Sequence, residues 1–294
     1  MTNTIKFEKL GAGTYKATVT IPWAKIEAAK EKALVDLQKT FESKGFRKGK
    51  APAKVVRETL GDQKLLEEGS KYFLSDAYVE IIETNKLKPF IDPKITLVKA
   101  PIGTEWEVRF EIAEAPVVSK LADYRKIAAA VAGDLKKDDI WVPGKDKKDE
   151  AQTEEQMAQR KNQKMQKIFD KVLTESEMEI SPLILDYEVT RRLTSIFDEI
   201  KKLGLTVEQY MASKKETAES MRENARKEVI DIYKSEFILD EIANKEKVTV
   251  DEKDLEPLYK TAKTDAEKET LKQNAYMYTR IMRKQKTLDF IASL

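Results

Sequence analysis

Hydrophobic and polar residues alternate along two stretches of the first 115 residues, with the period of a half-buried β-strand. Thr14–Ile21 places Tyr, Ala, Val and Ile at every second position, and Glu105–Ile112 does the same with Trp, Val, Phe and Ile. Gly11–Gly13 separates the first stretch from the shorter run Ile5–Phe7. We therefore predict a β-hairpin at the start of the chain.

Between these strands the apolar residues recur every three or four positions, which is typical of helices that bury one face. Pro22 ends the strand and suits the first turn of a helix, and this helix carries apolar residues from Ile26 to Phe41. A second helical stretch covers Leu66–Ile81. The mixture of patterns predicts a small α+β domain over residues 1–115.

Residues 116–160 interrupt both patterns. An alanine-rich stretch at 126–133 leads into residues 134–155, which hold eight acidic and five basic side chains. Such segments are usually solvated, so we predict a charged linker over 116–160. A single short strand or arm that packs on a neighbouring element is the alternative.

Residues 161–294 keep helical spacing and predict an all-α domain. Ser181 is predicted to be an N-cap, with Pro182 at the first position of the helix that follows. Gly204 is a credible stop for this helix. Thr206 with Gln209 indicates a capping box for a short helix that ends near Met211.

Two longer apolar stripes follow, over residues 225–242 and 271–291, and Thr264 with Glu267 is predicted to cap the last helix. The predicted fold class is an α+β N-terminal domain followed by an all-α C-terminal domain. We expect an elongated, mostly helical multidomain protein.

Composition narrows the chemistry that the chain can perform. The 294 residues include 54 Lys and Arg against 52 Asp and Glu, a net charge of +2, and neither cysteine nor histidine. Disulfides, thiol nucleophiles, Cys/His zinc sites and histidine-based triads are therefore excluded. No acidic loop is spaced for a hard cation and no glycine loop is spaced for a nucleotide. We expect no metal, no cofactor and no catalytic residue.

The chain shows no targeting or membrane segment. Met1–Leu10 lacks the apolar run of a signal peptide. Nowhere do about 18 consecutive apolar residues occur. We expect a cytoplasmic protein without a membrane partner.

The most unusual stretch is Gly45–Pro52, which lies between the two predicted helices of the first domain. Lys44–Arg57 holds six basic residues and no acidic one. The glycines permit backbone angles closed to other residues, and Pro52 sets the entry to the next helix. We expect a projecting cationic loop whose aromatic residue, Phe46, is an apolar anchor beside phosphate contacts. The alternative is an ordinary basic turn in which Phe46 folds back onto the helices.

Gly45–Pro52 resembles the ribosome-docking motif of the trigger factor family, bacterial chaperones that meet nascent chains at the ribosomal tunnel exit. The resemblance extends to Leu60–Gly61, the helix that reaches Asn85 and the strand end Phe110–Ile112. In the second half it includes residues 180–182, Glu188, Arg191, Arg192, Gly204, Tyr210 and residues 239–243. Together the two parts cover most of the chain.

The resemblance implies roles for the loop residues. Phe46, Arg47 and Lys48 match the core docking residues, which engage a ribosomal protein beside the tunnel exit and adjacent rRNA. The other loop residues would hold its shape or add charge, and they are Gly45, Gly49, Pro52 and Lys50.

The chain departs from the family in one large respect. Family members usually carry an FKBP-like prolyl isomerase domain between the two halves, where this chain has only the charged residues 116–160. That segment has few glycines, few aromatic residues and no series of alternating strands. We infer that the isomerase domain is missing and that the chain is not an enzyme.

For client binding the resemblance implies a diffuse cradle without a short motif, formed by the helical arms and the inner face of the N-terminal domain. Methionine and tyrosine suit surfaces that accept varied apolar segments, although core packing is their commoner role. The candidates in the helical half are Tyr210, Met211, Met221, Tyr276, Met277 and Met282.

The sequence thus predicts an ATP-independent, ribosome-associated holdase that shields nascent chains. An RNA-binding or ribosome-assembly factor using the basic 45–52 loop is the alternative, although a near-neutral chain is an unusual general nucleic-acid binder. A helical scaffold would leave the loop unexplained. The expected partners are the large ribosomal subunit and unfolded or nascent polypeptides, and a homodimer is left open.

Overall fold

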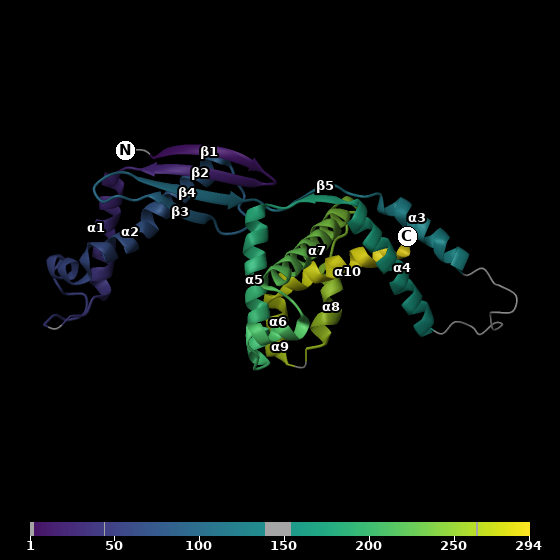
Figure 1. Ribbon diagram of the computed structural model, residues 1–294. Helices are drawn as coiled ribbons and strands as arrows, with labels where there is room; N and C mark the ends of the chain where they lie inside the picture. Colours follow the sequence, from purple (N-terminus) through teal and green to yellow (C-terminus); the bar gives the residue numbers. More distant parts are fainter. Residues whose placement is uncertain (1–2, 44, 139–153, 263) are drawn as a thin grey trace. The chain divides into compact units, whose positions relative to one another are not determined.

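The computed structural model describes residues 3–43, 45–138, 154–262 and 264–294 (Figure 1). The chain forms two compact units. The first comprises Met1–Ala115 with Ile180–Tyr187, and the second comprises Pro116–Glu179 with Glu188–Leu294.

A four-stranded antiparallel sheet forms one layer of the first unit. Its strands lie in the order β1-β2-β4-β3. The predicted hairpin is confirmed, since β1 pairs with β2 and places Phe7 opposite Ala17. The strands are β1 (Thr4–Gly11), β2 (Thr14–Ile21), β3 (Lys94–Lys99) and β4 (Trp106–Ala113).

Two helices cover one face of this sheet (Figure 1). Helix α1 (Trp23–Thr40) follows Pro22, and α2 (Ala53–Asn85) follows Pro52 and is interrupted at Gly61. The alternation of β2 and β4 turns every second side chain toward the helices and builds the core. Its most buried members are Ala17, Val19, Ile21, Ile26, Ala77, Ile81, Val108, Phe110 and Ile112.

In its described residues the second unit is helical apart from one short antiparallel strand pair, β5 (Val117–Lys120) with β6 (Glu177–Glu179). Its core is mainly aliphatic, with Ile168, Val172, Ile238, Ile242 and Ile291 all fully buried. The helices are α3 (Tyr124–Asp138), α4 (Glu154–Glu175), α5 (Pro182–Lys202, which starts in the first unit), α6 (Val207–Lys214), α7 (Ala218–Lys245), α8 (Glu252–Lys260), α9 (Asp265–Gln273) and α10 (Ala275–Ser293).

The predicted fold class, an α+β part followed by a helical part in a mostly helical chain, is confirmed. Among the described helices, none combines the length and the apolar character that crossing a membrane requires.

Several predicted helix ends are confirmed by hydrogen bonds. The Ser181 hydroxyl accepts a bond from the Leu183 backbone N–H at 3.2 Å and another from the Thr14 hydroxyl at 2.8 Å. Thr206 and Gln209 form the reciprocal capping box, at 3.2 and 2.9 Å. These side chains satisfy N–H groups that have no partner within a helix.

The last predicted helix is two helices in the structure. Thr264 accepts from the Glu267 N–H at 3.2 Å as expected, but the helix that it caps ends at Gln273. Asn274 donates its side-chain amide to the Thr270 carbonyl at 2.9 Å and separates α9 from α10. A side chain that bonds the local backbone competes with helix continuation.

The structure differs from the predicted linker at residues 116–138. These residues form β5 and α3, and they contribute to the buried cluster of the second unit. The physical reason is a stripe at positions i, i+3, i+4 and i+7 that the alanines and charges obscure: Tyr124, Ile127, Ala128 and Val131. Residues 139–153 lie outside the described part of the chain, and residues 154–160 of the predicted linker form the start of α4.

Strand β3 and helix α8 were not predicted. β3 is six residues long and none of its residues is buried, so burial imposes little alternation on its sequence. Helix α8 contains Pro257 in its interior, a residue that usually argues against a helix.

Candidate functional site

The segment between α1 and α2 rests on a small apolar cluster of its own. Ala51 is 1% exposed and packs with Leu34, Val56 and Leu65. Phe41, the first residue after α1, also packs against this cluster. The base of the loop is therefore anchored to both helices.

Backbone hydrogen bonds then set the course of the loop. The Gly49 N–H donates to the Phe41 carbonyl at 3.0 Å, and the Lys50 N–H donates to the Arg47 carbonyl at 2.9 Å. The Gln38 side-chain amide donates to the Ala51 carbonyl at 2.7 Å. The loop is thus closed on itself and tied to α1.

Gly49 is required at its position. Its φ is +75°, and a Cβ atom there would lie 2.7 Å from the Lys39 carbonyl oxygen. A residue with a side chain would combine a strained backbone with a steric overlap. The close approach of Gly49 to the end of α1 consequently depends on glycine.

The tip of the loop presents its side chains to solvent. Phe46 is 42% exposed and does not belong to the cluster beneath the loop. Arg47, Lys48 and Lys50 are exposed as well. Lys48 lies 3.4 Å from Glu42, and both side chains are more than 60% exposed, so this ion pair is weak.

The basic residues near the loop differ in how far they are neutralised. Arg57 donates to both carboxylate oxygens of Glu31 at 2.5 and 2.6 Å, and this contact raises the pKa of Arg57. Within the described part of the chain, Arg47 and Lys50 form no ion pair. Their charge therefore remains available to an anionic partner.

All seven predicted loop residues are brought together in this one segment: Gly45, Phe46, Arg47, Lys48, Gly49, Lys50 and Pro52. A planar guanidinium, two ammonium groups and one aromatic ring on a short tip can contact phosphates and one apolar pocket simultaneously. Lys44 lies outside the described residues.

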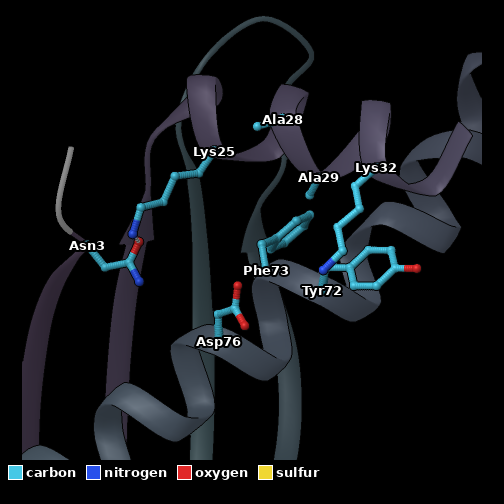
Figure 2. A pocket seen from close by; sticks show the side chains of 8 residues that line it. All are labelled: Asn3, Lys25, Ala28, Ala29, Lys32, Tyr72, Phe73 and Asp76. Atoms are coloured by element: carbon cyan, nitrogen blue, oxygen red, sulfur yellow. Dashed lines mark hydrogen bonds between the residues drawn. The ribbon is translucent and has the colours of Figure 1, made fainter. Parts of the chain in front are cut away.

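A hollow of about 280 Å³ lies elsewhere in the same unit, between the first half of α1 and the middle of α2 (Figure 2). Lys25 reaches Asn3 Oδ1 at 3.0 Å on one side, and Lys32 Nζ lies 4.2 Å from the centre of the Tyr72 ring on the other. The buried Phe73 lines it. Because both ammonium groups already have partners, we interpret this hollow as packing between the helices.

The predicted client-binding residues fall into two groups. Tyr276 and Met277 on α10 are 78% and 49% exposed, whereas Met221 on α7 is only 4% exposed. Tyr210, Met211 and Met282 are half-buried. An accessible apolar surface therefore centres on α10 and not on Met221.

Sequence reasoning missed the residue that extends this surface. Ile281, four positions after Met277 and thus on the same face of α10, is 55% exposed. The i, i+4 spacing from Met277 was the available signal. We call Tyr276, Met277 and Ile281 the α10 apolar face.

A second apolar feature of this unit is a groove of about 220 Å³ between α5 and α7. Val229 is buried and lines it, while Ile232 is 52% exposed. Tyr233 also lines the groove, and burial together with the nearby Glu188 raises its pKa to about 12. The tyrosine stays neutral at physiological pH.

In the described residues no group of three or more acidic side chains is placed to hold a metal ion.

Comparison with known proteins bears on both halves of the chain. The family model for the bacterial trigger factor protein matches residues 3–140, and the model for its C-terminus matches residues 146–293. The trigger factor of Clostridium botulinum (strain Hall) is 30% identical over 123 residues, 42% of this chain and 28% of the relative. That of Streptococcus mutans is 31% identical over 125 residues, 42% of this chain and 29% of the relative. The chain thus spans under a third of these relatives' length.

A solved structure matches the whole chain. It covers 99% of both chains with a TM-score of 0.63 at 16% identity, and it concerns promiscuous substrate recognition in folding and assembly activities of the trigger factor chaperone. Together, the sheet unit with its helix–loop–helix tip and the helical unit define the class, a multidomain protein of α+β and helical parts. The chain belongs to the trigger factor family.

Proposed function

We propose that this chain is an ATP-independent molecular chaperone that docks on the large ribosomal subunit through loop 45–52 and shields unfolded or nascent polypeptides in the cytoplasm. The observation that carries the proposal is the loop itself. Its base is fixed by buried Ala51 and by the Gly49 hydrogen bond, while Phe46, Arg47 and Lys48 stay exposed. A preorganised tip loses little conformational entropy on binding.

Each exposed side chain would have a separate task. Arg47 and Lys48 would contact phosphates of rRNA, a salt-dependent and sequence-tolerant interaction. Phe46 would enter an apolar pocket on a ribosomal protein beside the tunnel exit, where a buried aromatic anchor contributes most to affinity.

Client shielding would use the second unit. The α10 apolar face and the α5–α7 groove offer apolar surface bordered by charge, which suits weak and reversible contact with varied segments. Tyr276, Met277 and Ile281 are the residues that we assign to client contact.

We further propose that the chain acts without prolyl isomerase chemistry. Only residues 141–145 separate the two family matches, too few to form a domain of their own. Shielding by mass action requires no covalent step and no cofactor.

Docking can be tested by co-sedimentation with vacant ribosomes over a series of salt concentrations. The triple variant Phe46→Ala/Arg47→Ala/Lys48→Ala is expected to lose binding and to keep its suppression of client aggregation. A matched control is Phe197→Ala/Lys201→Ala/Lys202→Ala on α5, where Phe197 is 41% exposed and both lysines are exposed. Failure of the unaltered protein to sediment with ribosomes, or equal loss in the control, would contradict the docking role.

The alternative, an RNA-binding or assembly factor, is separated by single variants. If the loop reads phosphate alone, Phe46→Ala binds normally and Arg47→Ala/Lys48→Ala does not. If Phe46 is an anchor, both variants lose ribosome binding.

A further inference from the structure

The two edge strands of the sheet in the first unit are covered to different extents. The order β1-β2-β4-β3 leaves one side of β1 and one side of β3 without a neighbouring strand among the described residues. Ile5 and Phe7 of β1 pack against the core, whereas no β3 side chain belongs to that cluster. All six residues of β3 are exposed. Of the two edge strands, β3 is therefore the one whose side chains are left uncovered by the core.

The register shows that β3 extends the apolar face of the sheet beyond the helices. Ile95 lies opposite Phe110, and Leu97 lies opposite Val108. Directly opposed residues of an antiparallel pair share a face, and Phe110 and Val108 are fully buried beneath the helices. Ile95 and Leu97 share that face, yet they remain 43% and 53% exposed.

Edge strands are usually protected by lysines, prolines or bulges, and β3 has such features only at its ends. Lys94 lies 3.9 Å from Glu111, and Lys99 lies 3.7 Å from Glu107. The register shifts between Leu97 and Lys99. The residues between, Ile95–Val98, carry no charge and no proline. This leaves an unblocked edge long enough for a short strand.

We propose that β3 binds an extended apolar segment of an unfolded polypeptide as an added strand of the sheet. Only an extended chain supplies backbone donors and acceptors at the spacing of a sheet edge. Every second side chain of the segment would lie beside Ile95 and Leu97, and acidic residues at its ends would meet Lys94 and Lys99. The identity of the occupant as a chaperone client rests on the proposed function.

The probe for this surface is a fluorescein-labelled peptide with alternating valine and threonine and a glutamate at each end. Its affinity is measured by fluorescence anisotropy on the full chain. Ile95→Lys/Leu97→Lys is expected to weaken binding roughly tenfold or more, because it removes two apolar cross-strand contacts and adds charge. The control Val35→Lys/Val79→Lys makes the same charge change on exposed helix residues of this unit and is expected to bind normally.

A second peptide tests the backbone pairing on the unaltered protein. Methylation of every peptide nitrogen between the two glutamates removes the donors along both edges and keeps every side chain, so it is expected to abolish binding. Amide exchange in β3 is expected to slow when the unmethylated peptide saturates the protein. Equal binding of the methylated peptide, or equal loss in the Val35/Val79 control, would overturn the inference.

Two further outcomes keep this inference distinct from the proposed function. If the peptide does not bind while aggregation is still suppressed, β3 is not a client edge and the chaperone function stands. The second outcome is that the unaltered protein forms concentration-dependent dimers. If Ile95→Lys/Leu97→Lys abolishes these dimers and the peptide does not compete with them, the edge belongs to a second copy of this chain and the inference is overturned.

Discussion

The two compact units hold their helices together in different ways. In the first unit aromatic rings connect the sheet to α2, with Phe73 edge-on to Trp106 at 5.6 Å and Tyr78 stacked on Phe110 at 6.2 Å. In the second unit a mainly aliphatic core, in which Tyr124 packs edge-on to Phe290, is supplemented by charged contacts between helices. Glu236 of α7, for example, accepts from Arg280 and Lys284 of α10 at 2.8 Å each.

The difference matters for what each unit can present on its surface. A core built by a sheet and two helices can hold one loop in one conformation, which suits a specific docking site. Helices connected through partly exposed ion pairs leave apolar residues distributed along their faces, which suits varied clients. We therefore expect local precision in the first unit and a diffuse surface in the second.

Removing a ring from the aromatic core of the first unit should have the greatest effect. Phe110→Ala should destabilise this unit by about 3–5 kcal/mol, because it removes a fully buried ring and leaves a cavity. Urea unfolding followed by tryptophan fluorescence, with Trp141 replaced by Phe in all variants, reports on Trp23 and Trp106, both in this unit. The exposed Val35→Ala is the control and should stay within about 0.5 kcal/mol of the unaltered protein. A small change in Phe110→Ala would mean that the core does not rest on this ring.

A smaller effect is expected from the backbone of the docking loop. Gly49→Ala should cost about 2 kcal/mol, since it adds an unfavourable positive φ and a contact with the Lys39 carbonyl. Gly45→Ala is the matched control, because Gly45 has a φ of +94° and a Cβ atom added there would meet nothing within 4 Å. Urea unfolding and ribosome co-sedimentation should both show the greater loss in Gly49→Ala. Equal losses in the two variants would mean that the positive φ alone, and not the contact with the Lys39 carbonyl, destabilises Gly49→Ala.

The polar contact between α3 and the end of α7 should contribute less. The Tyr124 hydroxyl donates to Glu246, to which Arg125 also donates at 2.9 and 2.8 Å. Tyr124→Phe should lower the stability of the second unit by about 1 kcal/mol through the lost hydrogen bond. Thermal unfolding followed by circular dichroism checks this value, and an unchanged midpoint would contradict it.

The same contact predicts the direction of a pH effect. The hydrogen bonds from Tyr124 and then Arg125 lower the pKa of Glu246 from its ordinary value of 4.5. The folded state therefore favours the ionised carboxyl, so its contribution is present above that value and lost as the pH falls through the lowered pKa. The unfolding midpoint should fall more between pH 5 and pH 3, roughly, in the unaltered protein than in Glu246→Gln.

Stability should change least at Phe46. Since this ring is 42% exposed and outside the cluster beneath the loop, Phe46→Ala should change stability by less than about 0.5 kcal/mol. Ribosome co-sedimentation of the same variant should nevertheless be lost. A large drop in stability would show that Phe46 supports the loop and is not free for docking.

Much of the secondary structure could be predicted because its signals are local. Alternation over Thr14–Ile21 predicts β2, and the Thr206–Gln209 pair predicts the start of α6. The signals failed where other contacts decide the outcome. Residues 124–131 pack into the second unit despite their alanines and neighbouring charges, and β3 exists because β4 offers a pairing edge.

The candidate sites also differ in whether local sequence signals could predict them. The proposed docking loop could be singled out from its residues, because Lys44–Arg57 combines two glycines with six basic residues and no acidic one. The client surface could not, because exposure is a property of packing. Met221 and Met277 are alike in the sequence, but one is 4% exposed and the other 49%.

The order of residues alone was enough to identify the family and an α+β part before a helical part, and to single out the loop for which we propose docking, since motif chemistry and hydrophobic period act over a few neighbouring residues. Which apolar residues stay accessible, and which strand edge stays open, became clear only from the folded chain. Those properties depend on contacts between segments far apart in the chain, such as β2 with β4 and α10 with α7. No local pattern encodes them, because the same side chain is buried or exposed according to the elements that happen to cover it.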